Sequence, residues 1–405
     1  METLRSVIRF KRVETDRLER RLARAASVAD LRRIARRRLP GGVFDYIDGG
    51  AEDEHTMAAN QQAFADVAFR PRVLRGIERV DPAATILGRD AALPLVLAPT
   101  GFTRIADPDG ELAVARAAER AGVPYTLSTL STRSIEEVRA VSDGRLWFQV
   151  YAWRDRGLVQ EMVERAAAAR YEALVLTVDT AVFGRRERDV RRGFSLPPMI
   201  GPGTILDGAR HPGWTLDFVR GEPIRFANVV GRGVGDGASP VTLSDYINAQ
   251  FDPTLSWEDI DWLRTIWDGP IVVKGIQGVE DAVLAAERGV DAVALSNHGG
   301  RQLDGAPATF PLVAPVADAV GNRTEVICDG GVRRGSDIVK AVAAGATAAM
   351  AGRAYLYGLG AAGERGVDRV LEWFHADVVR TMSLLGAATV DDLDAQLLTV
   401  SAAAG

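Results

Sequence analysis

The sequence predicts one α/β domain folded as a (β/α)8 TIM barrel, with an N-terminal helical extension and a long loop after the fourth strand. From residue 93 onward, short β-branched runs alternate with amphipathic stretches of helical period, as in βα units around a parallel sheet. Eight such units in about 260 residues match the usual size of a closed barrel. An open, doubly wound sheet usually has fewer strands and an early glycine fingerprint for phosphate, so a barrel is expected.

Each strand candidate is a short apolar run followed by a stretch of helical period. Gly110–Gly122 and Ser336–Gly345 are examples of those helical stretches. The eight expected strands are Leu95–Ala98, Tyr125–Ser128, Leu146–Tyr151, Ala173–Val178, Ile271–Gly275, Ala292–Ser296, Glu325–Cys328 and Thr347–Met350.

The expected domain occupies residues 41–390, between a basic extension at 1–40 and a C-terminal tail at 391–405. Residues 194–254 are rich in Gly and Pro and are expected to form an insertion that covers the site, because loops of this length are usually functional or disordered. Residues 41–92 could close the bottom of the barrel or lean over its top. The C-terminal run Val367–Leu385 should be a helix on the barrel exterior, which makes Trp373 and His375 structural residues.

The charge distribution is uneven. The chain carries a net charge of −5, yet residues 1–40 hold thirteen Lys and Arg against five Asp and Glu. The acidic balance gives no reason to expect a nucleic-acid partner. The basic segment is interpreted as a solvated, partly helical extension, or alternatively as a peripheral contact with anionic lipid.

Cysteine use and hydropathy indicate the compartment. Cys328 is the single cysteine, which excludes an internal disulfide and fits a reducing environment. No apolar stretch reaches the roughly 18 residues that span a bilayer, and no signal-peptide pattern is present. The expected location is cytoplasmic, with at most peripheral contact at the inner face of the cell membrane.

Polar residues gather at the carboxyl ends of the expected strands, where barrel enzymes place their chemistry. A single Thr or Ser there is usually a helix cap, but burying so many polar groups around one mouth is costly unless a ligand satisfies them. In chain order these residues are Thr100, Ser128, Gln149 with Tyr151, Thr177 with Asp179, Lys274, Asn297 with His298, Asp329 with Gly330 and Gly331, and Gly352 with Arg353.

The seventh and eighth strand ends predict a phosphate site. Asp329–Gly335 and Gly352-Arg353 combine glycines, which expose backbone N–H groups, with arginines that bind phosphate through two nitrogens. Lys274 ends the fifth strand in apolar sequence and needs an anionic partner, either an electron-rich cofactor ring or a carboxylate of the barrel.

The stretch Ser296–Gln302 is the most specific local motif. His298 can accept a proton near neutral pH, and Arg301 can clamp a carboxylate with its planar fork. Asp179 on the fourth strand is available to stabilise an imidazolium at His298. His55, His211 and His375 have no metal-ligand spacing, so no metal site is expected.

Over roughly residues 30–390 the chain resembles the FMN-dependent L-2-hydroxy acid oxidase and dehydrogenase family, and within it the bacterial quinone-linked L-lactate dehydrogenases. The motifs that carry the resemblance are Phe44-Asp45-Tyr46, Ala98-Pro99-Thr100, Leu127-Ser128-Thr129, Phe148-Gln149-Val150-Tyr151, Thr177-Val178-Asp179, Gly184-Arg185-Arg186, Lys274-Gly275, the His298 stretch, Asp329-Gly330-Gly331 and Gly352-Arg353.

The resemblance implies a role for each of these residues. Tyr46, Arg186 and Arg301 would hold the substrate carboxylate, and Tyr151 would bind the substrate hydroxyl. His298 would be the catalytic base, with Asp179 stabilising its charged form. The expected FMN-binding residues are Thr100, Gly101, Ser128, Gln149, Thr177, Lys274, Ser296, Asp329, Gly331, Arg333, Gly352 and Arg353. Whether the α-hydrogen leaves as a hydride or as a proton stays open.

Two departures from the oxidases of the family concern the substrate pocket. Gly101 stands where oxidases often carry Ala, and Leu130 stands where glycolate oxidases carry Trp. The leading hypothesis is FMN-dependent oxidation of a small L-2-hydroxy acid, with L-lactate as the expected substrate and quinone or a similar acceptor, in a homotetramer. The alternatives are an oxidase that uses O2 on lactate, glycolate or mandelate, and a flavin enzyme for a larger peptide-derived substrate.

A non-redox phosphate-binding barrel, or a regulatory protein that has lost catalysis, is a further alternative from another class. The intact set of His298, Asp179, Arg301 and Tyr151 argues against the loss of catalysis.

Overall fold

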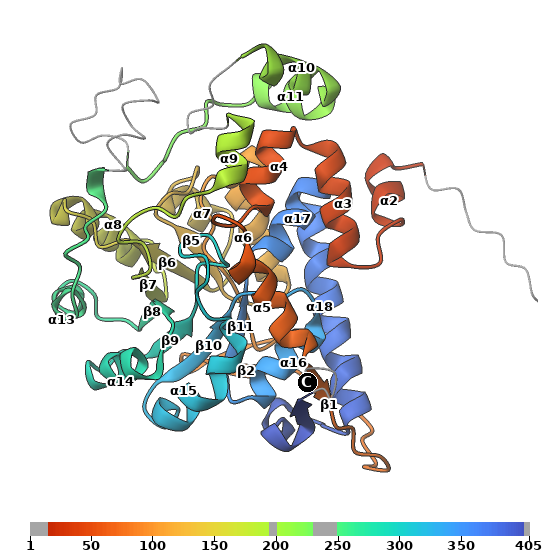
Figure 1. Cartoon of the computed structure of the whole chain (residues 1–405), viewed down its shortest axis with the longest axis vertical. Helices are drawn as coiled ribbons and strands as arrows, with labels where there is room; N and C mark the ends of the chain where they lie inside the picture. The colour runs from red at the N-terminus through yellow and green to blue at the C-terminus, as the bar shows by residue number, and fades with distance from the viewer. Residues whose placement is uncertain (1–14, 194–200, 230–248, 401–405) are drawn as a thin grey trace, which may run out of the picture.

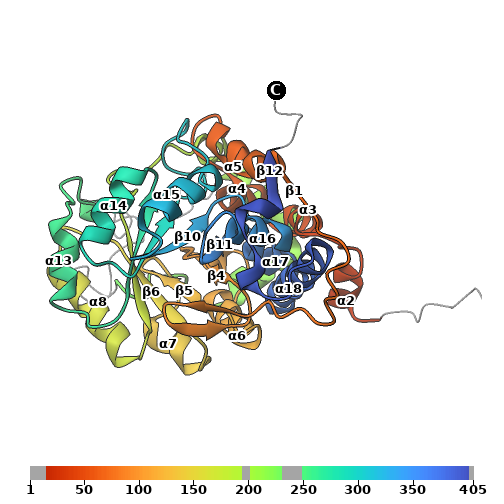
Figure 2. The ribbon, with the colours of Figure 1, turned by 90° about the horizontal axis from the view of Figure 1, so that it is seen from below.

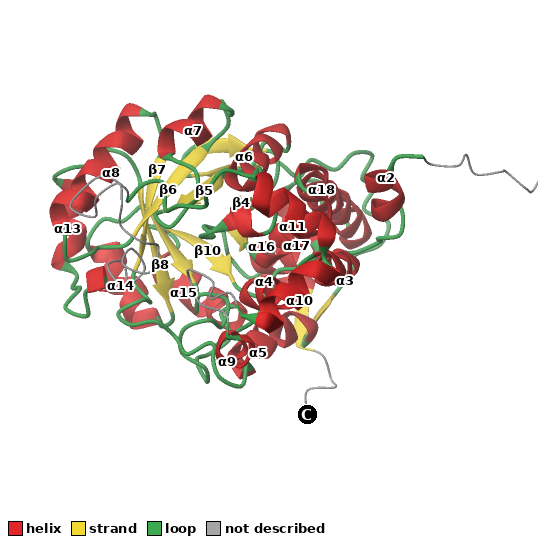
Figure 3. Cartoon of the chain, turned by 90° about the horizontal axis from the view of Figure 1, so that it is seen from above, coloured by secondary structure: helices red, strands yellow, loops and turns green. Residues whose placement is uncertain are grey.

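The computed structural model describes residues 15–193, 201–229 and 249–400, in which eight parallel strands close into a barrel (Figures 2 and 3). The order around the barrel is β10-β11-β4-β5-β6-β7-β8-β9. The strands are β4 (Leu95–Leu97), β5 (Tyr125–Ser128), β6 (Leu146–Val150), β7 (Ala173–Thr177), β8 (Ile271–Ile276), β9 (Ala292–Leu295), β10 (Glu325–Asp329) and β11 (Ala348–Ala351). The predicted fold class is confirmed, and each expected strand lies within two residues of its observed bounds.

Helices surround the barrel because each βα unit must cover the outer face of its strand. After β4 to β6 come α6 (Gly110–Arg120), α7 (Ile135–Ala140) and α8 (Arg156–Ala168), and α13 (Glu258–Arg264) precedes β8. After β8 to β11 come α14 (Val279–Glu287), α15 (Val313–Val320), α16 (Gly335–Ala343) and α17 (Arg353–Ala362). The long helix α18 (Glu364–Leu385) packs on α6, α16 and α17, with His375 exposed, as expected for an exterior helix.

A hairpin closes the amino-terminal end of the barrel. Strands β2 (Ala84–Ile86) and β3 (Arg89–Ala91) pair antiparallel, and Ile86 is fully buried beside Trp147 and Val272 of the barrel interior. In Figure 1, β2 lies at the opposite end of the molecule from α4 (Gly41–Asp48). Residues 41–92 therefore serve both ends, with the hairpin at the bottom and α4 at the mouth. Helix α5 (His55–Ala65) connects them.

The basic N-terminal segment is not a solvated extension throughout. Helix α2 (Arg17–Leu22) is followed by α3 (Val28–Arg38), which begins at the capping residue Ser27 and packs on α17 (Figure 1). Leu31 and Ala35, one helical turn apart, are buried in this contact. Leu22 of α2 is buried as well, so the solvated interpretation is wrong from residue 22 onward, because apolar residues on one face of these helices lie between the charged ones. Residues 1–14 lie outside the described part of the chain.

The C-terminal segment is also more ordered than a tail. Strand β12 (Leu398–Val400) pairs antiparallel with β1 (Val67–Phe69), which precedes the barrel in the chain. Residues 391–400 thus return to the body of the molecule. The short 3-10 helices are η1 (Thr103–Ile105), η2 (Phe310–Leu312), η3 (Val390–Asp392) and η4 (Ala395–Leu397).

The insertion after β7 contains helices as well as loop. Helices α9 (Glu187–Arg192), α10 (Pro202–Arg210) and α11 (Pro212–Arg220) follow β7, and α10 and α11 lie over α4 in Figures 1 and 3. The sequence predicts only a loop here and misses both helices, although Pro202 and Pro212 each stand at the first helical position, where proline is favoured. Residues 194–200 and 230–248 of the insertion lie outside the described part.

Candidate active site

A cavity of about 460 Å³ opens at the carboxyl ends of the barrel strands, a size within the range of cofactor and ligand sites. Sixteen of the eighteen residues predicted from the sequence line it. They are Tyr46, Thr100, Gly101, Ser128, Gln149, Tyr151, Thr177, Arg186, Lys274, His298, Arg301, Asp329, Gly331, Arg333, Gly352 and Arg353.

The other two predicted residues, Asp179 and Ser296, lie behind His298 and hold it in place. Asp179 Oδ1 is 2.9 Å from His298 Nδ1, and Ser296 Oγ accepts a hydrogen bond of 3.0 Å from the His298 backbone N–H. His298 has a φ of 56°, in the left-handed region that few non-glycine residues adopt. The backbone at His298 is therefore strained, and because Nδ1 faces Asp179, Nε2 is the ring nitrogen left for a substrate.

The His298–Asp179 pair is arranged for proton acceptance. Burial lowers the pKa of His298 below its ordinary value, and the negative charge of Asp179 offsets this only in part. Burial alone would raise the pKa of Asp179, but the charges of His298 and Lys274 hold it below its usual range. At neutral pH His298 is therefore a neutral base beside an ionised carboxylate.

Asp179 reaches this position because the second-to-last residue of β8 is a glycine. Gly275 has a φ of 115°, and a Cβ there would lie 2.9 Å from Asp179 Cβ. Gln302 holds the same segment by donating to the Asp179 carbonyl at 3.0 Å and to the Val182 carbonyl at 2.9 Å. A larger residue at 275 would displace the carboxylate from His298.

Two arginines and a tyrosine form a cationic corner of the cavity. The guanidinium groups of Arg186 and Arg301 lie 5.8 and 5.2 Å from the centre of the Tyr46 ring. Burial and the charges of Arg186 and Arg353 lower the pKa of Arg301 to about 9. The Arg186 Nε is buried without a hydrogen-bond partner in the described structure. This corner would be stabilised by an anion such as a carboxylate.

Tyr151 lines the cavity as a hydrogen-bond donor. Burial, followed by the negative charge of Asp179, raises its pKa, so the phenol stays protonated. Its ring packs edge-on against Phe251, with ring centres 5.1 Å apart. The packing fixes the ring while the hydroxyl remains available to a ligand.

Lys274 has the carboxylate partner that the sequence left as one of two possibilities. Its Nζ is 3.0 Å from Asp329 Oδ2 and 2.9 Å from Ser296 Oγ, and Ser296 in turn donates to Asp329 at 2.7 Å. Burial disfavours the ammonium, but the charges of Asp329 and Asp179 raise the pKa of Lys274. The lysine is therefore a charged group on the cavity wall.

The seventh and eighth strand ends form a concave cradle of backbone and arginine. Gly331 has a φ of 88°, and a Cβ there would lie 2.2 Å from the Asn60 carbonyl oxygen, so only glycine fits. Gly352 precedes α17, whose amino-terminal end favours an anion. Arg353 donates to the carbonyls of Gly299 and Gly49 at 2.7 and 2.8 Å, while its buried Nε has no partner in the described structure.

Other cavity residues were missed by the sequence analysis. Phe102 and Phe226, with ring centres 5.5 Å apart, form an apolar wall, and Asp189 of α9 also lines the cavity. Phe226 lies in the insertion and Asp189 lies in α9 just before it, where no strand end marks a position. Phe102 directly follows the singled-out Gly101 and could have been found from that proximity.

The closed barrel, the phosphate cradle and the buried His–Asp pair together define an enzyme that binds a phosphorylated cofactor. A family model described as FMN-dependent dehydrogenase matches residues 35–400. The chain therefore belongs to the FMN-dependent dehydrogenase family, and the resemblance drawn from its motifs is confirmed.

Individual relatives agree with this assignment. The chain is 46% identical over 397 residues to a putative L-lactate dehydrogenase of Mycobacterium tuberculosis, covering 98% of this chain and 94% of that protein. It is 44% identical over 374 residues to the L-lactate dehydrogenase of Caulobacter vibrioides, covering 92% and 97%. Its structure is similar to that of the monotopic membrane protein (S)-mandelate dehydrogenase, with a TM-score of 0.89, 42% identity and coverage of 93% and 99%.

The cavity fits FMN. Buried Gln149 Nε2 and Thr177 Oγ1 line it and have no partner in the described structure, so a ligand with polar ring edges would satisfy them. The glycine and arginine cradle fits a phosphate monoester. Among the described residues no cluster of His, Cys, Asp and Glu is suited to a metal ion.

Proposed function

We propose that this protein oxidises L-lactate, or a near relative among the small L-2-hydroxy acids, to the 2-oxo acid with FMN as its cofactor. The proposal rests on one observation: a single cavity is lined by His298, which is paired with Asp179, by the Arg186–Arg301 corner and by the phosphate cradle. Relatives named L-lactate dehydrogenase at 44–46% identity support lactate as the substrate.

In this proposal the substrate is held at two points. Arg186 and Arg301 bind its carboxylate together with Tyr46, and Tyr151 binds its hydroxyl. His298 accepts a proton at Nε2, since Nδ1 is engaged by Asp179. Asp179 stabilises the imidazolium that results.

FMN, when bound, supplies the acceptor for two electrons. Thr100, Gly101, Ser128, Gln149 and Thr177 are assigned to its ring. Lys274, supported by Ser296 and Asp329, is assigned to the part of the ring that gains negative charge. The residues assigned to the phosphate are Gly331, Arg333, Gly352 and Arg353.

A larger aromatic 2-hydroxy acid is the second candidate substrate. Phe102, Phe226 and Leu130 give the cavity an apolar wall, and a Cβ at position 101 would lie 3.1 Å from Leu130 Cβ, a tight contact that glycine avoids. The structural similarity to (S)-mandelate dehydrogenase supports this candidate.

The test is anaerobic mixing of FMN-loaded protein with L-lactate, D-lactate and (S)-mandelate, following the bleaching of the flavin. Rapid bleaching by L-lactate alone is the expected result, and faster bleaching by (S)-mandelate would favour the aromatic candidate. Protein that stays colourless after incubation with FMN would contradict the assignment of the cofactor site. No bleaching by any 2-hydroxy acid would exclude the proposed substrate class.

We also propose that electrons pass to a quinone rather than to O2. The reduced protein is then mixed either with air or with a soluble quinone analogue. Fast reoxidation by the quinone and slow reoxidation by air is expected, and the reverse order would make the protein an oxidase.

We further propose a cytoplasmic homotetramer that touches the inner face of the membrane through α10 and α11. Among the described residues no helix is both long and apolar enough to cross a bilayer. The apolar side chains exposed on these two helices are Ile205, Leu206, Leu216, Phe218 and Val219. A soluble mutant of the membrane-associated (S)-mandelate dehydrogenase from Pseudomonas putida aligns with a TM-score of 0.82, which supports a peripheral contact in this family.

The membrane contact is tested by co-sedimentation with anionic lipid vesicles. Leu216→Asp combined with Phe218→Asp should abolish sedimentation without loss of activity, whereas equal sedimentation of this variant would contradict the contact. Light scattering after size-exclusion chromatography measures the mass of the oligomer.

A further inference from the structure

We propose that Arg188 is a positioning residue for the substrate carboxylate. It joins the segment that carries Arg186 to the end of α4 that carries Tyr46. This inference rests on the proposed function, because it concerns the site to which the carboxylate is assigned.

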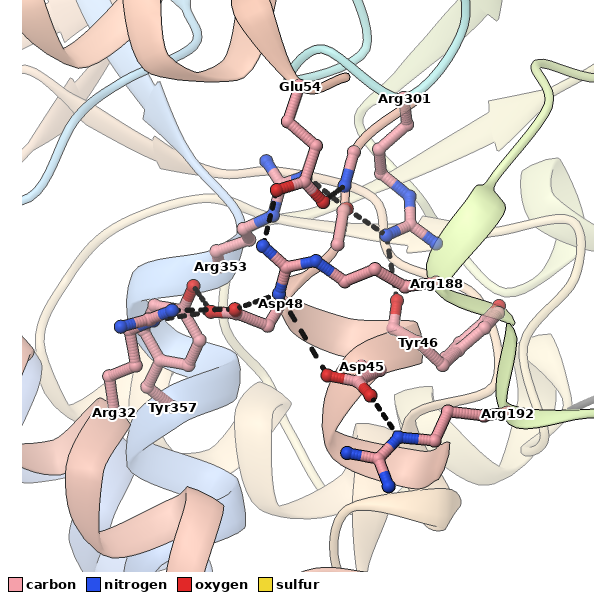
Figure 4. Close-up of polar contacts among 12 residues, drawn as sticks. Arg32, Asp45, Tyr46, Asp48, Glu54, Arg188, Arg192, Arg301, Arg353 and Tyr357 are labelled. Carbon is pink, nitrogen blue, oxygen red and sulfur yellow. Dashed lines mark hydrogen bonds and ion pairs between the residues drawn. The ribbon is translucent and has the colours of Figure 1, made fainter. Parts of the chain in front are cut away.

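Arg188 lies between two carboxylates from different elements (Figure 4). One of its nitrogens is 2.8 Å from Asp48 Oδ2 at the end of α4, and the other is paired with Glu54 at the start of α5. Arg188 is the second residue of α9, two positions after Arg186. The ion pairs therefore fix the backbone directly after Arg186 against α4 and α5.

Asp48 is a buried anchor for this contact. Its side chain is 2% exposed and also accepts hydrogen bonds of 2.7 Å from Arg32 and from the Tyr357 hydroxyl. Burial would raise its pKa, but these donors and Arg188 lower it to about 2. Asp48 is thus ionised at neutral pH, and its partners on α3 and α17 keep it in place when Arg188 is replaced.

The same end of α4 receives the second carboxylate-binding arginine. Arg301 donates to the carbonyls of Tyr46 and Gly49 at 2.7 and 2.9 Å, and Arg353 donates to the Gly49 carbonyl at 2.8 Å. Carbonyls at a helix C-terminus lack intrahelical partners and favour cations. The carbonyl groups at the end of α4 therefore position the Arg301 guanidinium.

Arg186 itself lies in an irregular segment after β7, and α9 is also tied to α4 by the 2.8 Å ion pair between Arg192 and Asp45 (Figure 4). Glu52 N–H donates to the Arg185 carbonyl at 2.9 Å, and the Gly50 N–H donates to Glu54 at 2.8 Å. The first bond ties the residue before Arg186 to the α4–α5 turn, the second holds the turn itself, and Arg188 adds a charged link from that turn to α9. Its loss would let Arg186 move relative to Arg301, and the two-point grip on a carboxylate would be loosened.

The test measures binding rather than turnover. FMN-loaded Arg188→Met is titrated with 2-hydroxyisobutyrate, which has a carboxylate and a hydroxyl but no α-hydrogen, and the flavin absorbance reports its binding. The dissociation constant should rise on the order of ten-fold, since a misplacement of about 1 Å can cost as much as 10²-fold in rate. The affinity for FMN, measured by fluorescence quenching, should stay at the wild-type value.

Two further variants make the outcome specific. Arg191→Met removes the same charge from the same helix, but Arg191 pairs with Glu187 within α9, so it should bind 2-hydroxyisobutyrate like wild type. Arg188→Lys keeps one ion pair, so its dissociation constant for 2-hydroxyisobutyrate should lie between those of the wild type and Arg188→Met. If Arg188→Met does not fold, the test is made with Arg188→Lys.

A wild-type dissociation constant in both Arg188 variants would overturn the inference, as would an equal loss in Arg191→Met. An equal weakening of FMN and 2-hydroxyisobutyrate would also overturn it, because Arg188 would then be a general structural residue. If the wild-type protein itself binds no 2-hydroxy acid, the proposed function fails, and the inference fails with it.

Discussion

The two ends of the barrel bury charged side chains in different ways. At the closed end, Arg145 is 2.8 Å from Glu172 and also donates to the Ile86 carbonyl at 2.9 Å, while Glu325 accepts a 2.9 Å bond from the Leu87 N–H. These charges have partners within the protein, and they hold the β2–β3 hairpin over the barrel.

At the open end, the buried charges keep unused bonding capacity. Arg186 Nε, Arg353 Nε and Asp179 Oδ2 are buried without partners in the described part of the chain. Leaving such groups unsatisfied costs free energy that a ligand would recover. The paired charges at the closed end therefore stabilise the fold, whereas the unpaired groups at the open end favour the binding of a ligand.

The largest expected effect is at the open end. His298→Asn should lower the rate of flavin reduction by about 10²–10⁴, because the proton acceptor is removed, while asparagine tolerates the left-handed backbone. Stopped-flow reduction by L-lactate measures the rate, and urea unfolding checks that stability is kept. His375→Asn, on the exposed side of α18, is the control and should react like wild type. A rate within a few-fold of wild type in His298→Asn would make His298 a structural residue.

The next effect is at the closed end and should appear in stability. Arg145→Met should lower the free energy of unfolding by about 2 kcal/mol, because the half-buried Glu172 loses one of its two arginine partners and the hairpin loses the bond to the Ile86 carbonyl. Arg89→Met removes the other partner of Glu172, but this arginine is 63% exposed, so the loss should be below about 1 kcal/mol. Urea titration of the FMN-loaded proteins measures both values. Equal losses, or slower flavin reduction in folded Arg145→Met, would break the division between the two ends.

The smallest expected effect is a shift in pH dependence. His298 must be neutral to accept a proton, and its pKa is held below 6.5, so kcat/KM should fall only below that pH. Asp179→Asn removes a charge that raises this pKa, and the acidic limb should therefore move to still lower pH, with a lower plateau. Profiles of kcat/KM between about pH 5 and 8 measure the shift. Two results would contradict the assignment of His298 as the base. One is a fall of kcat/KM that begins at or above pH 6.5 in the wild type, and the other is a fall that moves to higher pH in Asp179→Asn.

The barrel and most of the residues that line the cavity could be predicted from the sequence, because both depend on local patterns. Each βα unit is recognised by the hydrophobic periodicity of its strand and helix. The strands of the barrel are parallel, so their carboxyl ends lie at the same end of it. Lys274 and His298 could therefore be placed in one site although 24 residues separate them. The sequence could not name the carboxylate partner of Lys274, and the structure places Asp329 Oδ2 3.0 Å from its Nζ.

The repeating architecture and the chemistry of the strand ends are thus encoded locally in the sequence. The packing of α3 on α17, the pairing of β12 with β1 and the ion pairs of Arg188 became visible only in the folded chain. Arg188 is separated by 140 and 134 residues from its partners Asp48 and Glu54. The physical reason is that such contacts depend on the packing of distant surfaces. A charge run or a short apolar segment does not reveal its partner until the chain has folded.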